Sequence, residues 1–195
     1  MKVACVLTAA GNSVRFGSDK LMRVVSGAPM IERALSLLSD IELCFRVVVT
    51  QPNKERIVGM AGEYGFCVAF NDRPQLGMSE SVKIGVAEVL KNCSPDGILF
   101  CVADQPYLKR KSAVELIECF KKNPCSIVRL AANGRVGNPV IFPQDTFSGF
   151  FEIEGDIGGS AVIAKHREKM IVCDVAKPIE LCDIDTEQED YDVRT

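Results

Sequence analysis

A run of small residues with two basic side chains follows the first apolar segment of this chain. Residues 3–7 are apolar, and the next stretch reads Thr8-Ala-Ala-Gly-Asn-Ser-Val-Arg-Phe-Gly-Ser-Asp-Lys20. Small residues let a ligand approach the backbone, and the amides of such a loop form a concave anion site. Arg15 and Lys20 add two positive charges, so we expect a polyphosphate ligand. The alternative is an ordinary glycine-rich turn with two solvated cations.

Two carboxylates further along the chain are candidate ligands for a metal ion bound to a phosphate. Asp104 follows directly on the apolar run 97–103, and Asp156 lies inside the glycine-rich stretch 155–160. The carboxyl ends of parallel strands are where open α/β sheets bind their ligands. Mg²⁺ is held on nucleotides by one or two carboxylates together with phosphate oxygens. A surface turn would also favour Asp, so both interpretations stay open for Asp104.

Other chemistries lack the residues they need. The one histidine, His166, lies between two basic residues, and we expect it on the surface. We therefore expect no Ser-His-Asp or Cys-His catalysis. The nine cysteines include no Cys-x-x-Cys pair. We interpret them as structural residues of a reducing cytoplasm rather than as disulfides or zinc ligands.

Length and charge narrow the class of protein further. The formal net charge of −3 argues against a nucleic acid or an anionic membrane surface as partner. No apolar run approaches the ~20 residues that span a bilayer, and we expect a cytoplasmic protein. A chain of 195 residues fits a single domain, 1–195.

Strands and helices alternate along most of the chain, which indicates how the chemical groups are positioned. Apolar, β-rich runs predict strands at 3–7, 45–50, 66–70, 97–103 and 126–132. Helical periodicity predicts helices at 28–38, 54–63, 79–91 and 111–122, with Ser79 as the N-cap of the third. This alternation predicts an α/β fold with a mostly parallel sheet and helices on both faces.

The last third of the chain is less regular. We expect a turn or loop at 133–138, a strand at 139–142, a short helix at 147–151 and a helix at 161–166. Two late strands, 170–175 and 179–184, follow in the prediction, antiparallel to the main sheet. The acidic end, 183–191, is predicted as a solvated cap or a short helix.

Taken together, these pieces resemble the MobA-like nucleotidyltransferase family. Thr8 to Lys20 is similar to the family signature LAAGxSxRFGxxK, with Thr8 where Leu is usual. Four further stretches match in the same order, at 77–81, 103–106, 137–140 and 155–158. The stretch 183–190 is similar to the family's DIDTPEDL-like ending, with Glu187 in place of Pro.

The resemblance implies a Rossmann-like three-layer α/β/α fold and transfer of a nucleoside monophosphate from an NTP, with release of pyrophosphate. Guanylyl-transferring members carry Gly-Gly in the signature where this chain has Ala10-Gly11. Ala10 therefore favours the cytidylyltransferase branch, with CTP as donor. In that branch the acceptor is the terminal phosphate of the molybdopterin cofactor, and a molybdenum hydroxylase is a possible recipient of the product.

From the resemblance and the local chemistry together we expect the following roles. Arg15, Lys20 and Asp104 are candidate catalytic residues, with Lys20 nearest the α-phosphate. Asp104 and Asp156 are expected to share Mg²⁺, the expected cofactor, and Gly137 and Asn138 to face the acceptor. The expected nucleotide-binding residues are Ala9, Ala10, Gly11, Asn12, Ser13, Arg15, Lys20, Gly77 and Ser81.

Two other functions fit the same residues. One is transfer of CMP or another nucleotide to a sugar or polyol phosphate, although 195 residues leave little room for a C-terminal sugar domain. The other is a non-catalytic carrier that delivers cofactor to a molybdenum hydroxylase. The presence of both candidate carboxylates favours an enzyme over a carrier.

Overall fold

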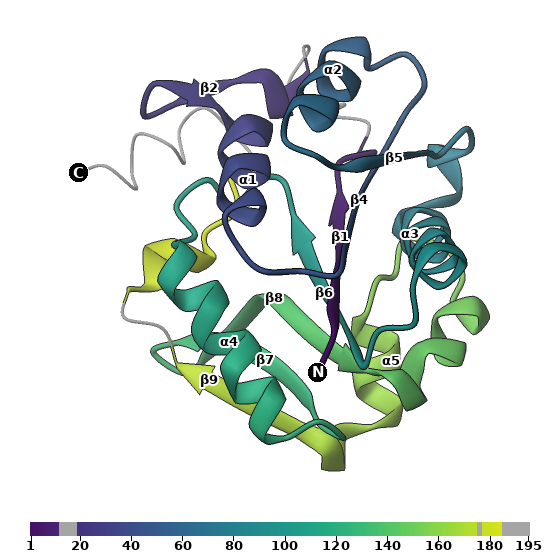
Figure 1. The fold of residues 1–195 in the computed structure, drawn as a ribbon, viewed down its shortest axis with the longest axis vertical. Helices are drawn as coiled ribbons and strands as arrows, with labels where there is room; N and C mark the ends of the chain where they lie inside the picture. Colours follow the sequence, from purple (N-terminus) through teal and green to yellow (C-terminus); the bar gives the residue numbers. More distant parts are fainter. Residues whose placement is uncertain (12–18, 175–176, 185–195) are drawn as a thin grey trace.

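A seven-stranded sheet forms the centre of the molecule (Figure 1). The computed structural model describes residues 1–11, 19–174 and 177–184. The strands lie in the order β5-β4-β1-β6-β8-β7-β9, and β8 runs antiparallel to both of its neighbours. The other neighbouring pairs are parallel, which confirms the predicted mostly parallel sheet. The strands of this sheet are β1 (Val3–Thr8), β4 (Phe45–Thr50), β5 (Cys67–Phe70), β6 (Gly97–Val102), β7 (Ile127–Ala132), β8 (Arg135–Pro143) and β9 (Met170–Asp174).

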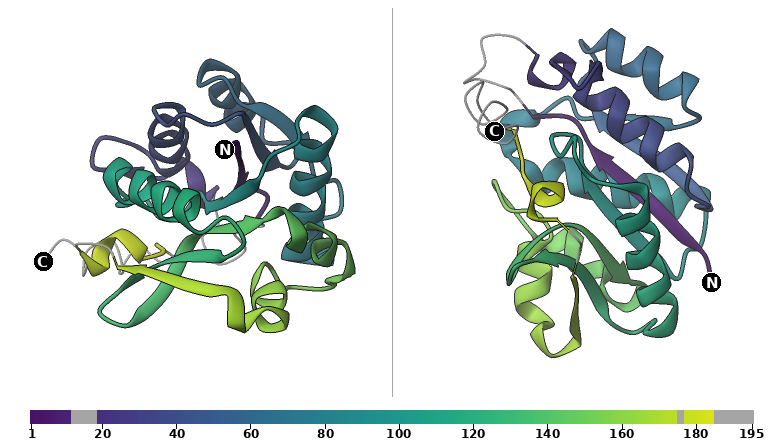
Figure 2. Two further views of the ribbon diagram at one scale, coloured as in Figure 1. Left: turned by 60° about the horizontal axis from the view of Figure 1, so that its bottom comes forward. Right: turned by 90° about the vertical axis from the view of Figure 1, so that its left-hand side faces the viewer.

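Helices cover both faces of this sheet, so the predicted three-layer α/β/α arrangement is confirmed (Figures 1 and 2). Side chains of α1, α2 and α4 pack on one face, and those of α3, η3 and α5 pack on the other. The α-helices are α1 (Met30–Ser39), α2 (Glu55–Glu63), α3 (Met78–Asn92), α4 (Arg110–Lys122) and α5 (Ser160–Lys165). Shorter elements are η1 (Lys20–Met22), β2 (Val24–Val25), β3 (Ala28–Pro29), η2 (Pro74–Leu76), η3 (Gln144–Glu152), η4 (Arg167–Lys169) and η5 (Pro178–Leu181).

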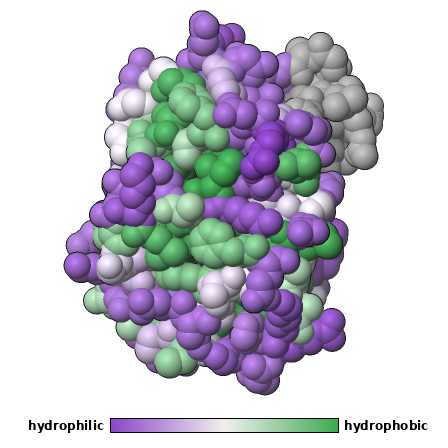
Figure 3. Space-filling view, turned by 90° about the vertical axis from the view of Figure 1, so that its right-hand side faces the viewer, coloured by the Kyte–Doolittle hydropathy of each residue, from purple (hydrophilic) through white to green (hydrophobic). Residues whose placement is uncertain are grey.

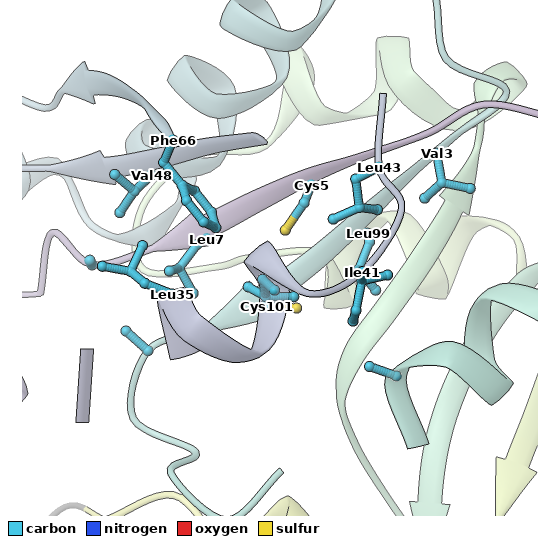
Figure 4. Close-up of a cluster of buried hydrophobic side chains, with 14 of the residues drawn as sticks. Val3, Cys5, Leu7, Leu35, Ile41, Leu43, Val48, Phe66, Leu99 and Cys101 are labelled. Atoms are coloured by element: carbon cyan, nitrogen blue, oxygen red, sulfur yellow. The ribbon is translucent and has the colours of Figure 1, made fainter. Parts of the chain in front are cut away.

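The alternation of side chains along β1 explains why two separate cores form. Cys5 and Leu7 point into the core beneath α1, α2 and α4, which Figure 4 shows. Ala4 and Val6 point into the core beneath α3 and α5. Successive residues of a strand face opposite sides of the sheet, so an apolar run without polar interruptions is what a strand covered on both faces requires.

The hairpin that joins β7 to β8 is tighter than the sequence predicted. The turn consists of Asn133 and Gly134, both with positive φ, and the strand resumes at Arg135. The predicted turn is confirmed at 133–134, whereas Gly137 and Asn138 lie within β8, so its extension to 138 was wrong. Gly137 and Asn138 lie at an irregularity of the β7–β8 ladder, between Val136 and Val140, and pairing on both sides of them continues the strand.

The late elements also differ from the prediction. β9 pairs with β7 in parallel register, because the chain crosses over the α3 face through η3 and α5 before returning to the sheet edge. The predicted strand at 179–184 is instead the 3₁₀ helix η5 followed by an extended segment. Pro178 begins that helix, where its missing N–H costs no helical hydrogen bond.

The longest helix, α3, has 15 residues. Among the residues that the structure describes, no helix is both long and apolar enough to traverse a lipid bilayer.

Candidate functional site

The loop that follows β1 leaves the sheet between β4 and β6, at their carboxyl ends. Ala9 donates its amide to the carbonyl of Val49 at 2.8 Å, which extends the β1–β4 ladder by one residue. The carbonyl of Ala10 accepts a hydrogen bond from the side-chain amide of Gln51 at 2.8 Å. Ala9 and Ala10 are both buried. The sheet already uses the Ala9 amide, and a contact of Ala9 with a nucleotide stays a prediction.

Lys20 and Asp104, two predicted catalytic residues, meet although they are 84 positions apart. The ammonium Nζ lies 2.8 Å from the carboxylate Oδ2, and the side chains retain 12% and 27% of their exposure. Lys20 begins η1, and the carboxylate of Asp19 caps that turn by accepting the amide of Leu21 at 3.3 Å. The pair places a cation and an anion beyond the carboxyl ends of β1 and β6, where each could bind a ligand.

Lys54, which was not predicted from the sequence, contacts Gly11 and Asp19, one on each side of the stretch 12–18. Its ammonium lies 3.0 Å from the carboxylate of Asp19 and 3.4 Å from the carbonyl of Gly11. The Lys54 side chain is only 11% exposed, so it is held in this position. The signal in the sequence was a lysine just after the Gln-Pro-Asn turn that ends β4. Asn12, Ser13 and Arg15, predicted to bind phosphate, lie outside the described residues.

The predicted nucleotide-binding turn at 77–81 forms the start of α3. Gly77, with φ of +90°, is the N-cap, so Ser79 lies inside the first turn and the predicted Ser79 cap was wrong. Ser81 is buried, and its hydroxyl accepts a hydrogen bond from the amide of Asn71 at 2.9 Å. Asn71 in turn accepts the amide of Arg73 at 2.9 Å. A contact of Ser81 with a nucleotide stays a prediction.

Asp156 acts as the cap that α3 lacks in its own sequence. Its carboxylate accepts the amide of Met78 at 3.2 Å, and the carbonyl of Gly155 accepts the amide of Ser79 at 3.2 Å. A Cβ on Gly77 would lie 2.5 Å from the backbone of Gly155, so the two turns touch. Carboxylates favour helix N-termini, which gives Asp156 a structural role whether or not it also binds metal.

The segment 177–184 lies along the turn that holds Asp104. The amide of Ile184 donates to the carbonyl of Asp104 at 3.0 Å, and Gln105 donates to the carboxylate of Asp183 at 2.8 Å. Among the described residues, these contacts bring Asp183 beside the Asp104 turn, whereas Asp156 binds the start of α3. The sequence analysis gave Asp183 no role, because the pairing depends on a contact between residues distant in sequence.

Gly137 and Asn138, the predicted acceptor residues, lie on β8 beside a cavity of about 200 Å³. Asn138 lines that cavity, and the carbonyl of Gly137 accepts a hydrogen bond from Arg129 Nε at 3.0 Å. Arg129 also lines the cavity, and burial lowers the pKa of its guanidinium. The sequence analysis missed Arg129, whose signal was a charge inside the otherwise apolar run 126–132.

The cavity lies on the face of the sheet that α3 and α5 cover. Met78 lines the cavity and is 46% exposed, and Ile157, which precedes the lining residue Gly158 in the chain, is equally exposed. Figure 3 shows hydrophobic side chains gathered across the middle of this face. Exposed apolar side chains next to a cavity favour a ligand with apolar surface.

The donor set at the carboxyl edge fits Mg²⁺ bound together with phosphates. Asp104 offers carboxylate oxygens at the end of β6, and Asp183 offers a second carboxylate nearby. Within the described residues, no three or more His, Cys, Asp or Glu side chains cluster. Mg²⁺ retains water and phosphate ligands, so one or two carboxylates are sufficient for it.

A doubly covered, mostly parallel sheet with an Asp104–Lys20 pair beyond its carboxyl edge belongs to the class of α/β folds that bind ligands at that edge. Residues 5–170 match the MobA-like NTP transferase domain, and the chain belongs to this family of nucleotidyltransferases. A probable molybdenum cofactor guanylyltransferase of Aquifex aeolicus (strain VF5) is 26% identical over 126 residues. That stretch is 64% of this chain and 57% of the Aquifex protein, so the chain spans less than two thirds of that relative.

Solved structures support the same fold. A homologue of Mycobacterium tuberculosis Rv0371c from Mycobacterium sp. strain JC1 has a TM-score of 0.83 at 22% identity, covering 98% of this chain and 95% of its own. The 4-diphosphocytidyl-2C-methyl-D-erythritol synthase of Anaerococcus prevotii has a TM-score of 0.75 at 15% identity, covering 98% and 94%. Both likenesses concern the fold.

Proposed function

We propose that this nucleotidyltransferase transfers CMP from CTP to the terminal phosphate of the molybdenum–molybdopterin cofactor and releases pyrophosphate. The observation that carries the proposal is the Lys20–Asp104 pair at the carboxyl edge of β1 and β6, beside the glycine-rich loop. Family membership supports nucleotidyl transfer, and the Aquifex relative supports a molybdenum cofactor as acceptor. A sugar or polyol phosphate acceptor and a carrier without activity are the alternatives that the assays below separate.

In the proposed reaction an oxygen of the acceptor phosphate attacks the α-phosphorus of CTP. The new P–O bond forms as the bond to the bridging oxygen of the β-phosphate breaks, and that oxygen leaves with pyrophosphate. A phosphate monoester is already largely ionised near pH 7, so the attack needs no strong general base. This agrees with a chain that has a single histidine, which the sequence places between two basic residues.

Positioning and charge neutralisation supply most of the catalysis in such transfers. Lys20 is proposed to turn from Asp104 to the α-phosphate, and Arg15 and the amides of Ala10 and Gly11 to bind the remaining phosphate oxygens. Mg²⁺ held by Asp104 would neutralise phosphate charge and favour the departure of pyrophosphate. Lys54 is proposed to keep the loop anchored at Gly11 during this exchange.

Asp156 and Asp183 compete for the place of the second metal ligand, and one pair of variants separates them. In Asp156→Asn the side-chain oxygen still accepts the amide of Met78, so α3 keeps its cap. Asp183→Asn likewise keeps an oxygen for Gln105. The variant that loses Mg²⁺-dependent turnover without losing thermal stability identifies the ligand, and two fully active variants would contradict a second carboxylate ligand.

The identity of the base rests on Ala10, which is 4% exposed and held against Gln51. Because the Aquifex relative is described as a guanylyltransferase, GTP is the alternative donor. The test is pyrophosphate release by the purified protein with molybdenum–molybdopterin and either CTP or GTP. Release with CTP supports the proposal, and release with GTP alone places the chain with the guanylyl-transferring members. Release with a sugar phosphate, or tight nucleotide binding without turnover, would contradict the proposed acceptor.

A further inference from the structure

A row of apolar side chains crosses the sheet on the α3 and α5 face and ends in a charge. Val6 pairs with Phe100, Phe100 pairs with Val140, and Val140 pairs with Arg129. Residues opposite each other in neighbouring strands project from the same face of the sheet. Arg129 therefore occupies a position where the rest of the row is apolar.

The guanidinium of Arg129 is partly desolvated without a compensating carboxylate. Its Nε donates to the carbonyl of Gly137 at 3.0 Å, and no Asp or Glu of the described residues forms an ion pair with it. Burial is the cause that lowers its pKa, yet a guanidinium keeps its charge at every physiological pH. Arg129 is partly buried among apolar neighbours, so an anion that enters the cavity would meet a cation that is only partly hydrated.

The cavity beside Arg129 connects it to the predicted transfer site. Thr8 and Val102, a register pair at the carboxyl ends of β1 and β6, line the cavity, and Asp104 follows two residues after Val102. Arg129 and Asn138 line it on β7 and β8. One cavity therefore extends from the carboxyl ends of β1 and β6, where the phosphate chemistry is predicted, to Arg129.

The sheet geometry gives the length of molecule that would span this cavity. Arg129 lies two strands from β6, or about 10 Å across the sheet. Phe100, in the same row as Arg129, precedes Val102, the last residue of β6, by two residues, or about 7 Å along the strand. The Cα of Arg129 is then about 12 Å from the end of β6, and Asp104 lies beyond that end, so a ligand that reaches both must be extended.

We propose that Arg129 binds a second anionic group of the acceptor, remote from the phosphate that accepts the nucleotide. The inference rests on the proposed transfer to an acceptor phosphate and adds to it a requirement on the acceptor. The apolar walls from Phe100, Val140 and Phe142 hold the part of the acceptor between its two charged ends. A short polyol phosphate without a second anion does not meet this requirement.

The kinetic test compares Arg129→Gln and Arg129→Lys with the native enzyme. Loss of one charge-assisted hydrogen bond predicts an acceptor KM raised about ten- to hundredfold in Arg129→Gln, with the KM for the nucleotide unchanged and a smaller effect in Arg129→Lys. Arg110→Gln is the matched control, because Arg110 also donates its Nε to a backbone carbonyl, that of Asp40, but lies on the surface. An unchanged acceptor KM in Arg129→Gln, or a nucleotide KM that rises in step with it, overturns the proposal.

A binding test is independent of the proposed reaction. Phenylphosphonate and its uncharged counterpart benzyl alcohol are titrated against ¹⁵N-labelled native protein, and the Nε–Hε resonance of Arg129 is followed by NMR. We expect a saturable shift with phenylphosphonate and none with benzyl alcohol at equal concentration. If this shift occurs while no acceptor is turned over, the anion site stands and the proposed function fails. No shift with phenylphosphonate, or equal shifts with both compounds, overturns the anion site.

Discussion

Replacing Lys20 with Met removes the cation that the account places nearest the α-phosphate. In the structure, Lys20 is 12% exposed and its ammonium lies 2.8 Å from Asp104. Methionine keeps most of the aliphatic volume, so the core around η1 loses little packing. The substitution separates two effects, because the same lysine stabilises Asp104 in the fold and is proposed to stabilise phosphate charge in the reaction.

The two effects have different expected sizes. A fully buried ion pair costs about 3–5 kcal/mol when one partner is removed, and exposed pairs contribute about 0–1 kcal/mol. The partly exposed Lys20–Asp104 pair lies between these limits, so we expect a loss of about 1–3 kcal/mol in the free energy of unfolding. Removal of one charge-stabilising donor lowers turnover on the order of 10²–10³-fold at comparable sites.

The double variant Lys20→Met, Asp104→Asn tests this separation. Asparagine removes the uncompensated carboxylate, so we expect stability to recover by most of the lost amount while turnover stays at least about 10²-fold below native. Urea unfolding measures the stability, and pyrophosphate release measures turnover. Near-native turnover in Lys20→Met, or turnover that recovers with stability in the double variant, would refute the catalytic assignment.

Three further perturbations test other parts of the account. Gly77→Ala is expected to lower the free energy of unfolding by about 2–4 kcal/mol, because the new Cβ would meet the backbone of Gly155 and the φ of +90° disfavours alanine. The control is Gly59→Ala in α2, where the Cβ would meet open space. This control should be neutral or stabilising in thermal unfolding. Burial, followed by the hydrogen bond with Cys44, raises the pKa of the Cys93 thiol to about 11, so its alkylation by iodoacetamide should be slow at pH 8 and accelerate up to about pH 11. Mass spectrometry checks this, and rapid alkylation of Cys93 at pH 7 would contradict it. Lys54→Met should raise the KM for the nucleotide about tenfold, because it removes the contacts of Lys54 with Asp19 and Gly11. Lys91 is exposed, and Lys91→Met should leave this KM unchanged. Equal KM values for the two variants would argue against a role of Lys54 in holding the loop.

Local sequence patterns were enough to predict most strands of the sheet and the helices α1 to α4 that cover it. Apolar runs such as 45–50 and 97–103 are buried on both faces, and that requirement is visible in composition alone. The β8 strand shows where such patterns fail. Gly137 and Asn138 favour a turn locally, but β8 continues through them because the residues on either side pair with β7, in a register that only the folded hairpin defines.

The sequence predicted that Lys20 and Asp104 lie at the same edge of the sheet, because each comes after a parallel strand, and the structure brings their side chains together. The candidate site was not predictable where a contact depends on two distant turns. Asp156 caps α3 by binding the amide of Met78, 78 residues earlier in the chain, and the sequence near either residue does not predict this contact. Arg129 marks an intermediate case, because a charge inside an apolar strand is visible in the sequence but its direction requires the sheet register.

The most direct test of the central claim is a crystal structure with Mn²⁺ and a non-hydrolysable CTP analogue. The account predicts the triphosphate at the loop after β1, with Lys20 turned from Asp104 to the α-phosphate. It also predicts an anomalous Mn²⁺ peak at about 2.1 Å from an oxygen of Asp104, the distance expected for a small hard cation. A triphosphate bound in the Arg129 cavity, or a metal ion that does not touch Asp104, would contradict it.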